Sequence, residues 1–148
     1  MPGTDFSAAQ GGYFGFELDK VSLGFFTACS GLSSEVDVIE QQQMTNSGKR
    51  LTVKQPGRKR TFPEVVLKRG FTKDRALNDW FDKTVDAAGK VERQTGSIVI
   101  YSRDFDEIAR FNLEGCWPSK LSVSDLSAGS GEAMVEELTI RHDLLTWA

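Results

Sequence analysis

The chain has 148 residues, of which 39% are hydrophobic and 26% are charged, and its formal net charge is −3. These values indicate one globular domain with its own core and exclude an intrinsically disordered chain, which combines low hydrophobicity with high net charge. No apolar run approaches the roughly 20 residues of a transmembrane helix and the N-terminus lacks a signal-peptide pattern, so we expect a protein made and folded in a cytoplasm.

The N-terminal part of the chain contains a polar arm and three strand patterns. Residues 1–12 are small and polar and predict a mobile arm ahead of a single domain over residues 13–148. In Tyr13–Asp19 apolar and acidic side chains alternate, which is typical of a strand with one buried face. A largely apolar run at Leu23–Cys29 and a second alternation at Glu35–Glu40 predict two more strands.

Residues 41–60 show neither a strand nor a helix pattern and are rich in Gln, Asn, Gly and Pro. We expect a long loop here. About 20 residues exceed the usual connection of about 4–6 residues, so such a loop needs a role or an ordering partner. The short run Leu51–Val53 also allows a projecting hairpin.

The same segment is the basic part of the chain. Between Gln41 and Pro63 there are six basic residues and no acidic residue. The six are Lys49, Arg50, Lys54, Arg58, Lys59 and Arg60. Without them the chain has 12 basic and 21 acidic residues, a net charge of −9. A basic segment on an acidic body can bind nucleic acid or another copy of that body. We favour another copy, because the segment has no aromatic residue for base stacking and the pI of the chain is about 5.2.

One helix pattern follows a strand at Phe62–Lys68. Beyond Gly70, apolar residues recur at three- and four-residue steps, which places them on one side of a helix that ends near Gly89. Thr72 can cap the start of this helix, and Asp74 suits the positive end of its dipole. The residues expected to pack into the β-structure are Leu77, Trp80, Phe81 and Val85.

Three further strand patterns fill the C-terminal part. Gly96–Tyr101 is largely apolar, Ile108–Glu114 alternates, and we expect Pro118 to end the second of these strands. Residues 124–132 predict a second flexible connection, and Met134–His142 predicts the last strand. The predicted fold is therefore mainly β, an antiparallel β-sandwich of the α+β type with one flanking helix. Its many short strands leave open edges, which are either blunted or used for assembly.

The residues do not support catalysis or a bound cofactor. The chain has no Gly-x-Ser-x-Gly nucleophile motif and no phosphate-binding glycine loop. One histidine, His142, and two separated cysteines exclude an ordinary zinc site, and we expect Cys29 and Cys116 to be buried free thiols rather than a disulfide. We therefore expect a protein that is not an enzyme and needs neither metal nor cofactor.

Eight short segments and one helix follow one another in a specific order and spacing. They are Phe14–Glu17, Ser30–Ser33, Glu35–Glu40 with Lys54–Gly57 after the loop, Val66–Gly70 with the helix that carries Trp80, Ser97–Ile100, Trp117–Lys120 and Glu136–Ile140. In this order they resemble the tail tube proteins of contractile phage tails and of phage-tail-like injection systems, over residues 13–147. Two residues depart from the family pattern: Pro63, where the strand usually continues, and Cys116, in place of a small residue before Trp117.

The resemblance implies a hexameric ring with one shared inner β-barrel, and rings that stack into a hollow rigid tube. A contractile sheath would surround the tube and drive it through a target envelope. The implied partners are further copies of the chain, a sheath protein, baseplate and tube-initiator or terminator proteins, and a cargo or tape-measure protein in the lumen. Assembly would take place in a bacterial cytoplasm, within a particle that can be released. From the residues of the basic segment we expect no specific nucleic-acid binding.

The basic segment is our candidate for the ring-stacking element. Its predicted stacking residues are Lys49, Arg50, Lys54, Pro56, Gly57, Arg58, Lys59 and Arg60. Three alternatives stay open: a type VI secretion-type tube protein, a tube initiator at the baseplate, and a monomeric β-sandwich binding module.

Overall fold

The structure is a computed structural model that describes residues 12–86, 93–124 and 134–148. Within these ranges it contains ten strands and one helix, which confirms the mainly-β fold with a single helix. The elements are β1 Tyr13–Leu18, β2 Val21–Phe26, β3 Ala28–Ser30, β4 Glu35–Met44, β5 Arg50–Thr61, β6 Val65–Gly70, α1 Ala76–Val85, β7 Gln94–Tyr101, β8 Glu107–Val123, β9 Val135–Arg141 and β10 Leu144–Trp147. No helix in the described part is long and apolar enough to cross a membrane.

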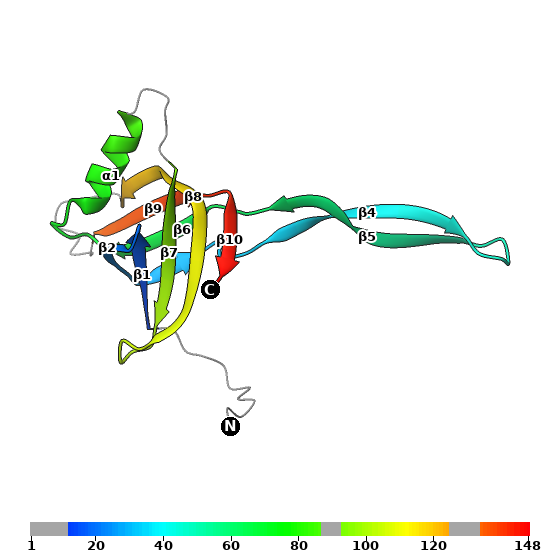
Figure 1. The fold of residues 1–148 in the computed structure, drawn as a ribbon, viewed down its shortest axis with the longest axis horizontal. Coiled ribbons are helices and arrows are strands. Elements are labelled where there is room, and N and C mark those ends of the chain that lie inside the picture. The colour runs from blue at the N-terminus through cyan, green and yellow to red at the C-terminus, as the bar shows by residue number, and fades with distance from the viewer. Residues whose placement is uncertain (1–11, 87–92, 125–133) are drawn as a thin grey trace.

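Eight strands form one antiparallel sheet that folds back on itself into two layers (Figure 1). The strand order is β2-β1-β7-β8-β9-β6-β3, and β10 also pairs with β8. The long strand β8 belongs to both layers, because its first half pairs with β7 and β10 and its second half pairs with β9. Gly115 lies at the change of layer with a φ of +64°, and a Cβ there would collide with the carboxylate of Asp143. Only glycine adopts this conformation without strain at such close approach.

The core lies between the two layers and is built from the alternating apolar faces of the strands. Phe16, Ile98 and Leu113 come from the first layer, and they are fully buried. Leu67, Leu138 and Ile140 come from the second layer and are fully buried too. Burying such a side chain contributes about 1.5–3 kcal/mol, so these positions account for the pairing of the two layers.

Helix α1 packs over one end of this core. It begins at Ala76, whose N–H donates a hydrogen bond to the Asp74 carboxylate at 3.0 Å. The Thr72 hydroxyl, which was expected to cap the helix, instead accepts from the N–H of Asp74, which precedes the helix, at 3.3 Å. Leu77 and Trp80 are buried, and the Trp80 indole N–H donates to the side-chain oxygen of Gln94 at 3.0 Å.

Phe81 is half-buried, but Val85, which the periodicity placed on the packed face, is 62% exposed in the subunit. The expectation for Val85 is therefore wrong for the isolated subunit, because the helix ends at this residue, beyond the edge of the core. The expected helix stop at Gly89 lies outside the described residues. So do most of the predicted N-terminal segment, residues 1–12, and most of the predicted connection, residues 124–132.

Three strand predictions need correction. Met134–His142 is not the last strand, because β10 follows it. The predicted strand Leu23–Cys29 is divided into β2 and β3, because the chain changes layer at Thr27, whose N–H bonds the carbonyl oxygen of Lys68 at 2.9 Å. Pro118 does not end its strand, since β8 continues to Val123. A register shift between Pro118 and Lys120 accommodates the proline, which has no N–H to give to the ladder.

The largest correction concerns residues 41–60, which are not a loop. They form the outer end of β4, the tip and nearly all of β5 in a long two-stranded hairpin that projects from the body, as the alternative based on Leu51–Val53 allowed (Figure 1). We call residues 35–61 the arm. All of β4 and nearly all of β5 are exposed. Because neither face is buried against the body, residues 41–60 have no apolar alternation by which their strands could be recognised. The alternation at Glu35–Glu40 predicted only the start of β4.

Candidate assembly surfaces

The arm places the predicted stacking residues on an exposed two-stranded ribbon. Lys49 lies in the tip, where the Thr45 N–H donates to its carbonyl oxygen at 2.8 Å, and the other seven residues lie on β5. Arg60 is held at the base of the arm, because its Nε donates to the Ser34 hydroxyl at 2.8 Å and its guanidinium lies 4.9 Å from the centre of the Phe62 ring. The remaining five cations make no ion pair within the described residues.

The two faces of the outer arm differ in charge. Residues directly opposite each other on paired strands share a face. One face pairs Met44 with Arg50 and Glu40 with Lys54, and we call it the charged face. The other face carries no charged side chain, and we call it the uncharged face. Its members are Ile39, Gln41, Gln43, Leu51, Val53 and Gln55.

Pro56 and Gly57 lie where the arm is distorted. The register shifts between Val36 and Val38, so that residues 57–59 stand opposite Asp37 alone. A Cβ on Gly57 would lie 2.7 Å from the Cβ of Asp37, closer than side chains approach each other, so glycine allows the tight bulge. The bulge projects Arg58 and Lys59 from the ribbon near its base.

The arm is basic relative to the body that carries it. Six basic and three acidic side chains give residues 35–61 a charge of +3, and since the whole chain carries −3, the rest carries −6. An isolated two-stranded hairpin is marginally stable in water. An exposed ribbon of opposite charge to the body is therefore suited to contact with a second copy of the chain.

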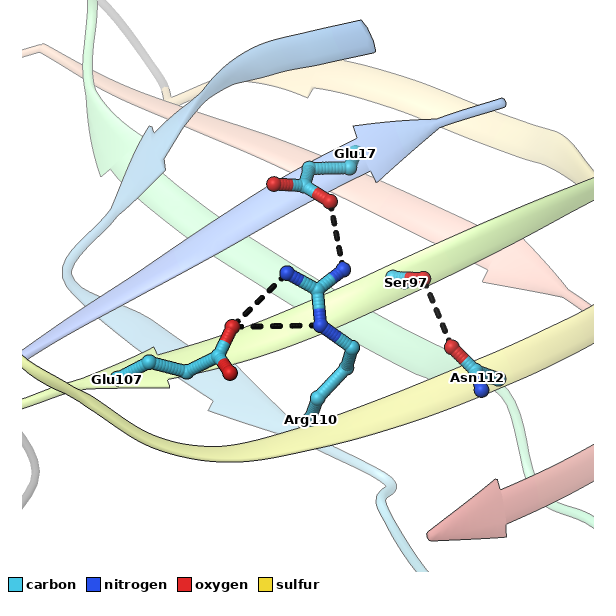
Figure 2. A network of polar contacts seen from close by, with 5 residues as sticks. All are labelled: Glu17, Ser97, Glu107, Arg110 and Asn112. Atoms are coloured by element: carbon cyan, nitrogen blue, oxygen red, sulfur yellow. Dashed lines mark hydrogen bonds and ion pairs between the residues drawn. The ribbon is translucent and has the colours of Figure 1, made fainter. Parts of the chain in front are cut away.

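A second surface is the polar face of β1, β7 and β8, whose residues alternate along the strands with the buried Phe16, Ile98 and Leu113; Figure 2 shows its polar contacts. Arg110 lies at its centre: its Nη1 donates to Glu17 at 2.7 Å, and its Nη2 donates to Glu107 at 2.8 Å. Next to it the Ser97 hydroxyl donates to the Asn112 side-chain oxygen at 2.8 Å. Hydrogen bonds, first to Glu17 and then to Glu107, raise the pKa of the Arg110 guanidinium above its ordinary value, so this cation stays charged.

The polar face is acidic as a whole. Arg110 is flanked by two carboxylates, and Glu114 adds a third on the same strand. One guanidinium against three carboxylates leaves a charge of −2 per subunit. The sequence did not reveal this network, because Glu17 and Arg110 are 93 residues apart and become neighbours only through the β1–β7–β8 order.

A third surface is aromatic and lies at the end of the same sheet where β7 turns into β8. The Tyr13 and Phe105 rings stack with centroids 4.8 Å apart, and Phe25 packs edge-on against Tyr101 (5.8 Å) and Phe105 (6.0 Å). We call these four residues the aromatic cluster. Phe105 is 56% exposed and Phe25 is 50% exposed, so the cluster is open to solvent in the single subunit.

The outer edges of β2, β3 and β10 have no strand partner in the described part of the chain. Unpaired edges bind further strands readily. These three edges are therefore open to pairing with a further strand.

The described residues offer little for chemistry. No group of three or more His, Cys, Asp or Glu side chains there could hold a metal ion. Both cysteines are free thiols, and burial raises the pKa of Cys29 to about 12 and that of Cys116 to about 11. Neither thiol is a nucleophile at neutral pH, because the thiolate is the reactive form.

Comparison with known proteins agrees with an assembly role. The family model described as T4-like virus tail tube protein gp19 matches residues 11–146. No curated protein matches the chain. Among solved structures, the chain is similar to a chain of the PVC sheath-tube complex of an extracellular contractile injection system in the extended state, with 22% identity, a TM-score of 0.72, and coverage of 93% of this chain and 88% of that chain.

It is also similar to a chain of the anti-feeding prophage tube terminating cap, with 24% identity, a TM-score of 0.73, and coverage of 100% and 99% of the two chains. A more distant similarity is to Hcp1 from Flavobacterium johnsoniae, with 14% identity, a TM-score of 0.50, and coverage of 92% and 94%. At these identities the structural similarities establish a shared fold.

Proposed function

Because the chain belongs to the T4-like virus tail tube protein gp19 family, we propose that it builds the inner tube of a contractile tail or phage-tail-like injection particle, as hexameric rings that stack into a hollow tube. The observation that carries this function is the family match over residues 11–146, which covers nearly all of the chain. Family membership gives the protein a structural role in a tail tube. Ring size, stacking contacts and cargo are the parts that we propose.

The open strand edges support ring formation. Pairing β-strands between neighbouring subunits around a ring removes exposed edges, as closure does in any barrel. The sheet that contains β2, β1, β7, β8 and β10 is our candidate for the shared inner barrel, because one of its faces lies on the core while the other carries the network of polar side chains around Arg110. We propose that the polar face around Arg110 lines the lumen.

We also propose that the arm is the ring-stacking element. Its charged face and the bulge at Arg58 and Lys59 would contact the acidic body of a subunit in the next ring. Leu51 and Val53 lie on the uncharged face, whereas Lys54 lies on the charged face. A single neighbouring surface that covers one face of the arm therefore cannot bury Leu51 and Val53 and also contact Lys54. The arm would therefore be held between two subunits, one on each side.

Similar proteins suggest the partners. The structures that resemble this chain belong to a sheath-tube complex, a tube terminating cap and a baseplate. We propose that this protein likewise contacts a sheath, a baseplate with its tube initiator, and a terminator, and that a cargo or tape-measure protein occupies the lumen. Assembly would take place in a bacterial cytoplasm, within a particle that can then be released.

Two related roles and one unrelated role compete with this proposal. A type VI secretion-type tube is less favoured, because the similarity to a type six secretion system protein has a TM-score of 0.54, against 0.72 and 0.73 for the PVC and anti-feeding prophage chains. A tube initiator would sit at the baseplate, and gene neighbours that encode a sheath, a baseplate and a second tube protein would distinguish it from the main tube. A monomeric binding module would not self-associate.

Size-exclusion chromatography and negative-stain microscopy of the purified protein test the proposal. We expect six-fold rings or stacked tubes whose integrity survives a chelator, because assembly rests on strand pairing and charge rather than on a metal. A protein that remains a 16.4 kDa monomer at high concentration would overturn the ring proposal and favour the binding module.

A further inference from the structure

The aromatic cluster is held in place by a strained turn. Phe105 has a φ of +63°, in the left-handed region that bulky residues avoid. The turn is closed by hydrogen bonds from the Phe105 N–H to the Ser102 carbonyl oxygen (3.0 Å) and from the Ser102 N–H to the Asp106 carbonyl oxygen (2.9 Å). A strained residue persists when its surroundings determine its conformation, and such residues gather at functional sites.

The strain has no evident benefit for the single subunit. Phe105 stacks on Tyr13, yet it leaves more than half of its side chain in water, so little apolar area is gained from a costly backbone conformation. Asn or Gly would adopt this φ at lower cost. The aromatic ring is therefore better explained by a contact outside the subunit. Exposed Tyr and Phe side chains with charged neighbours, here Asp104 and Asp106, are the usual composition of an interface centre and its rim.

The position of the cluster specifies which partner it would meet. Tyr13 pairs with Tyr101 at one end of β1, whereas Leu18 pairs with Val21 at the other end, next to the β1–β2 turn. Strands in a barrel run at about 35–45° to its axis, so the turns at their two ends lie on the two opposite rims. In the ring proposed above, the aromatic cluster would lie on one rim and the β1–β2 turn on the other.

The β1–β2 turn has complementary chemistry. Val21 is 63% exposed, and Lys20 beside it is an exposed cation. The exposed carboxylate of this turn is Asp19, and the exposed cation of the β7–β8 turn is Arg103, so each turn carries a charge opposite to one in the other. Head-to-tail stacking of identical hexamer rings would bring this turn toward the aromatic cluster of the next hexamer. Val21 would then face the aromatic side chains, and Lys20 would face Asp104 or Asp106. We propose that the aromatic cluster is a second stacking surface, which binds the β1–β2 turn of another copy of this chain. This inference rests on the tube function and adds an apolar contact that is separate from the basic arm.

Substituting Phe105 tests the proposal in assembly assays of the full chain. Phe105→Asn removes the ring but tolerates the positive φ, so the subunit should unfold at the same or a higher denaturant concentration than wild type. Rings should still form, whereas the critical concentration for tubes should rise at least about tenfold, which corresponds to about 1.4 kcal/mol. The matched control Phe105→Tyr keeps the ring and the backbone strain and should form tubes like wild type.

Combining substitutions on the two rims tests the identity of the partner. Val21→Ser should also weaken tubes, and adding Phe105→Asn to it should weaken them no further than the stronger single variant, because the two residues share one contact. Additive effects would overturn the assignment of the β1–β2 turn. Phe105→Asn tubes that form at the wild-type concentration would overturn the stacking role itself. If wild type forms neither rings nor tubes, the tube function fails instead, so the two failures are distinguishable.

Discussion

Arg69 and Glu136 face each other across β6 and β9 and form an ion pair at the end of the sandwich core. The Arg69 Nε and a Glu136 carboxylate oxygen are 2.9 Å apart, and the two side chains are 6% and 8% exposed. The guanidinium also lies over the Phe26 ring, 5.1 Å from its centre. The neighbouring pair, Lys68 and Glu137, lies on the opposite face of the same two strands. A shift of one strand by one residue would therefore turn Lys68 or Glu137 toward the core and separate Arg69 from Glu136. The pair therefore favours one register.

Removing one member of this pair should be costly. Arg69→Met leaves the Glu136 charge buried without a partner, and we expect it to lower the free energy of unfolding by about 3–5 kcal/mol. The double variant Arg69→Met, Glu136→Leu should recover much of that loss, since no buried charge remains. Urea unfolding at one fixed protein concentration measures all four members of the cycle. If the double variant loses the sum of the single losses, the two charges do not act as a pair.

Trp80 and Val85 lie on the same helix but differ in burial, which gives a second prediction. Trp80→Ala should cost about 3–5 kcal/mol, because it empties a packed site beside Phe16 and removes the hydrogen bond to Gln94. Val85→Ala, at an exposed position, should change the stability of the subunit by less than about 0.5 kcal/mol. Chemical denaturation of both variants, monitored by far-UV circular dichroism, tests this difference. Equal effects would show that the two positions are equally packed.

His142 predicts a pH dependence of stability. Its Nε2 lies 3.1 Å from the Pro63 carbonyl oxygen, and since a carbonyl only accepts, Nε2 carries the proton of the neutral ring. Nδ1 is buried and has no hydrogen-bond partner in the described ranges. Burial lowers the pKa of His142 below its ordinary value of 6.5, although the Pro63 carbonyl and the Asp143 charge act in the opposite direction.

The sign follows from proton binding. Below the ordinary pKa of 6.5 the unfolded chain binds the proton more readily than the folded chain, so the stability from neutral His142 is present above that pH and is lost on acidification. His142→Gln lacks this titration. We expect the stability difference between wild type and His142→Gln to fall between pH 7.5 and pH 5. A difference that stays constant over this range would contradict the burial effect. The carboxylates are common to both proteins and cancel in the comparison.

Much of the fold could be predicted from the sequence wherever an element has one buried face. The alternation in Tyr13–Leu18 and the periodicity of Leu77 and Trp80 are direct consequences of burial on one side, so they predicted β1 and α1. Over the described residues the structure confirms the mainly-β fold with a single helix, and the match to residues 11–146 confirms the family resemblance.

Elements without a buried face could not be predicted from the sequence, and neither could contacts between residues that are distant along the chain. Residues 41–60 of the arm show no alternation because both faces of the arm are in solvent, and the predicted loop followed from that. Only the start of β4, Glu35–Glu40, was recognised as a strand. The Arg110–Glu17 contact depends on the strand order, and the Phe105 ring position depends on a positive φ. These features belong to the proposed assembly surfaces, where the partner that would supply a buried face is another subunit.

The last prediction concerns the charge of the arm. Single surface ion pairs are worth only about 0–1 kcal/mol, but a six-subunit ring junction would contain six copies of each contact, so their sum decides whether rings stack. Changing Lys54, Arg58 and Lys59 to Glu should leave folded subunits and single rings intact while abolishing tubes.

Lys54 stands opposite Glu40, so the Glu variant also places two carboxylates across one strand pair. A triple Gln variant avoids this repulsion and should still stack more weakly than wild type, whereas the charge-preserving variant Lys54→Arg, Arg58→Lys, Lys59→Arg should stack normally. Added salt should weaken wild-type stacking in the same direction, because exposed charges are screened. Tubes of the Gln variant that equal wild type at low salt would show that the arm charge is not what joins the rings.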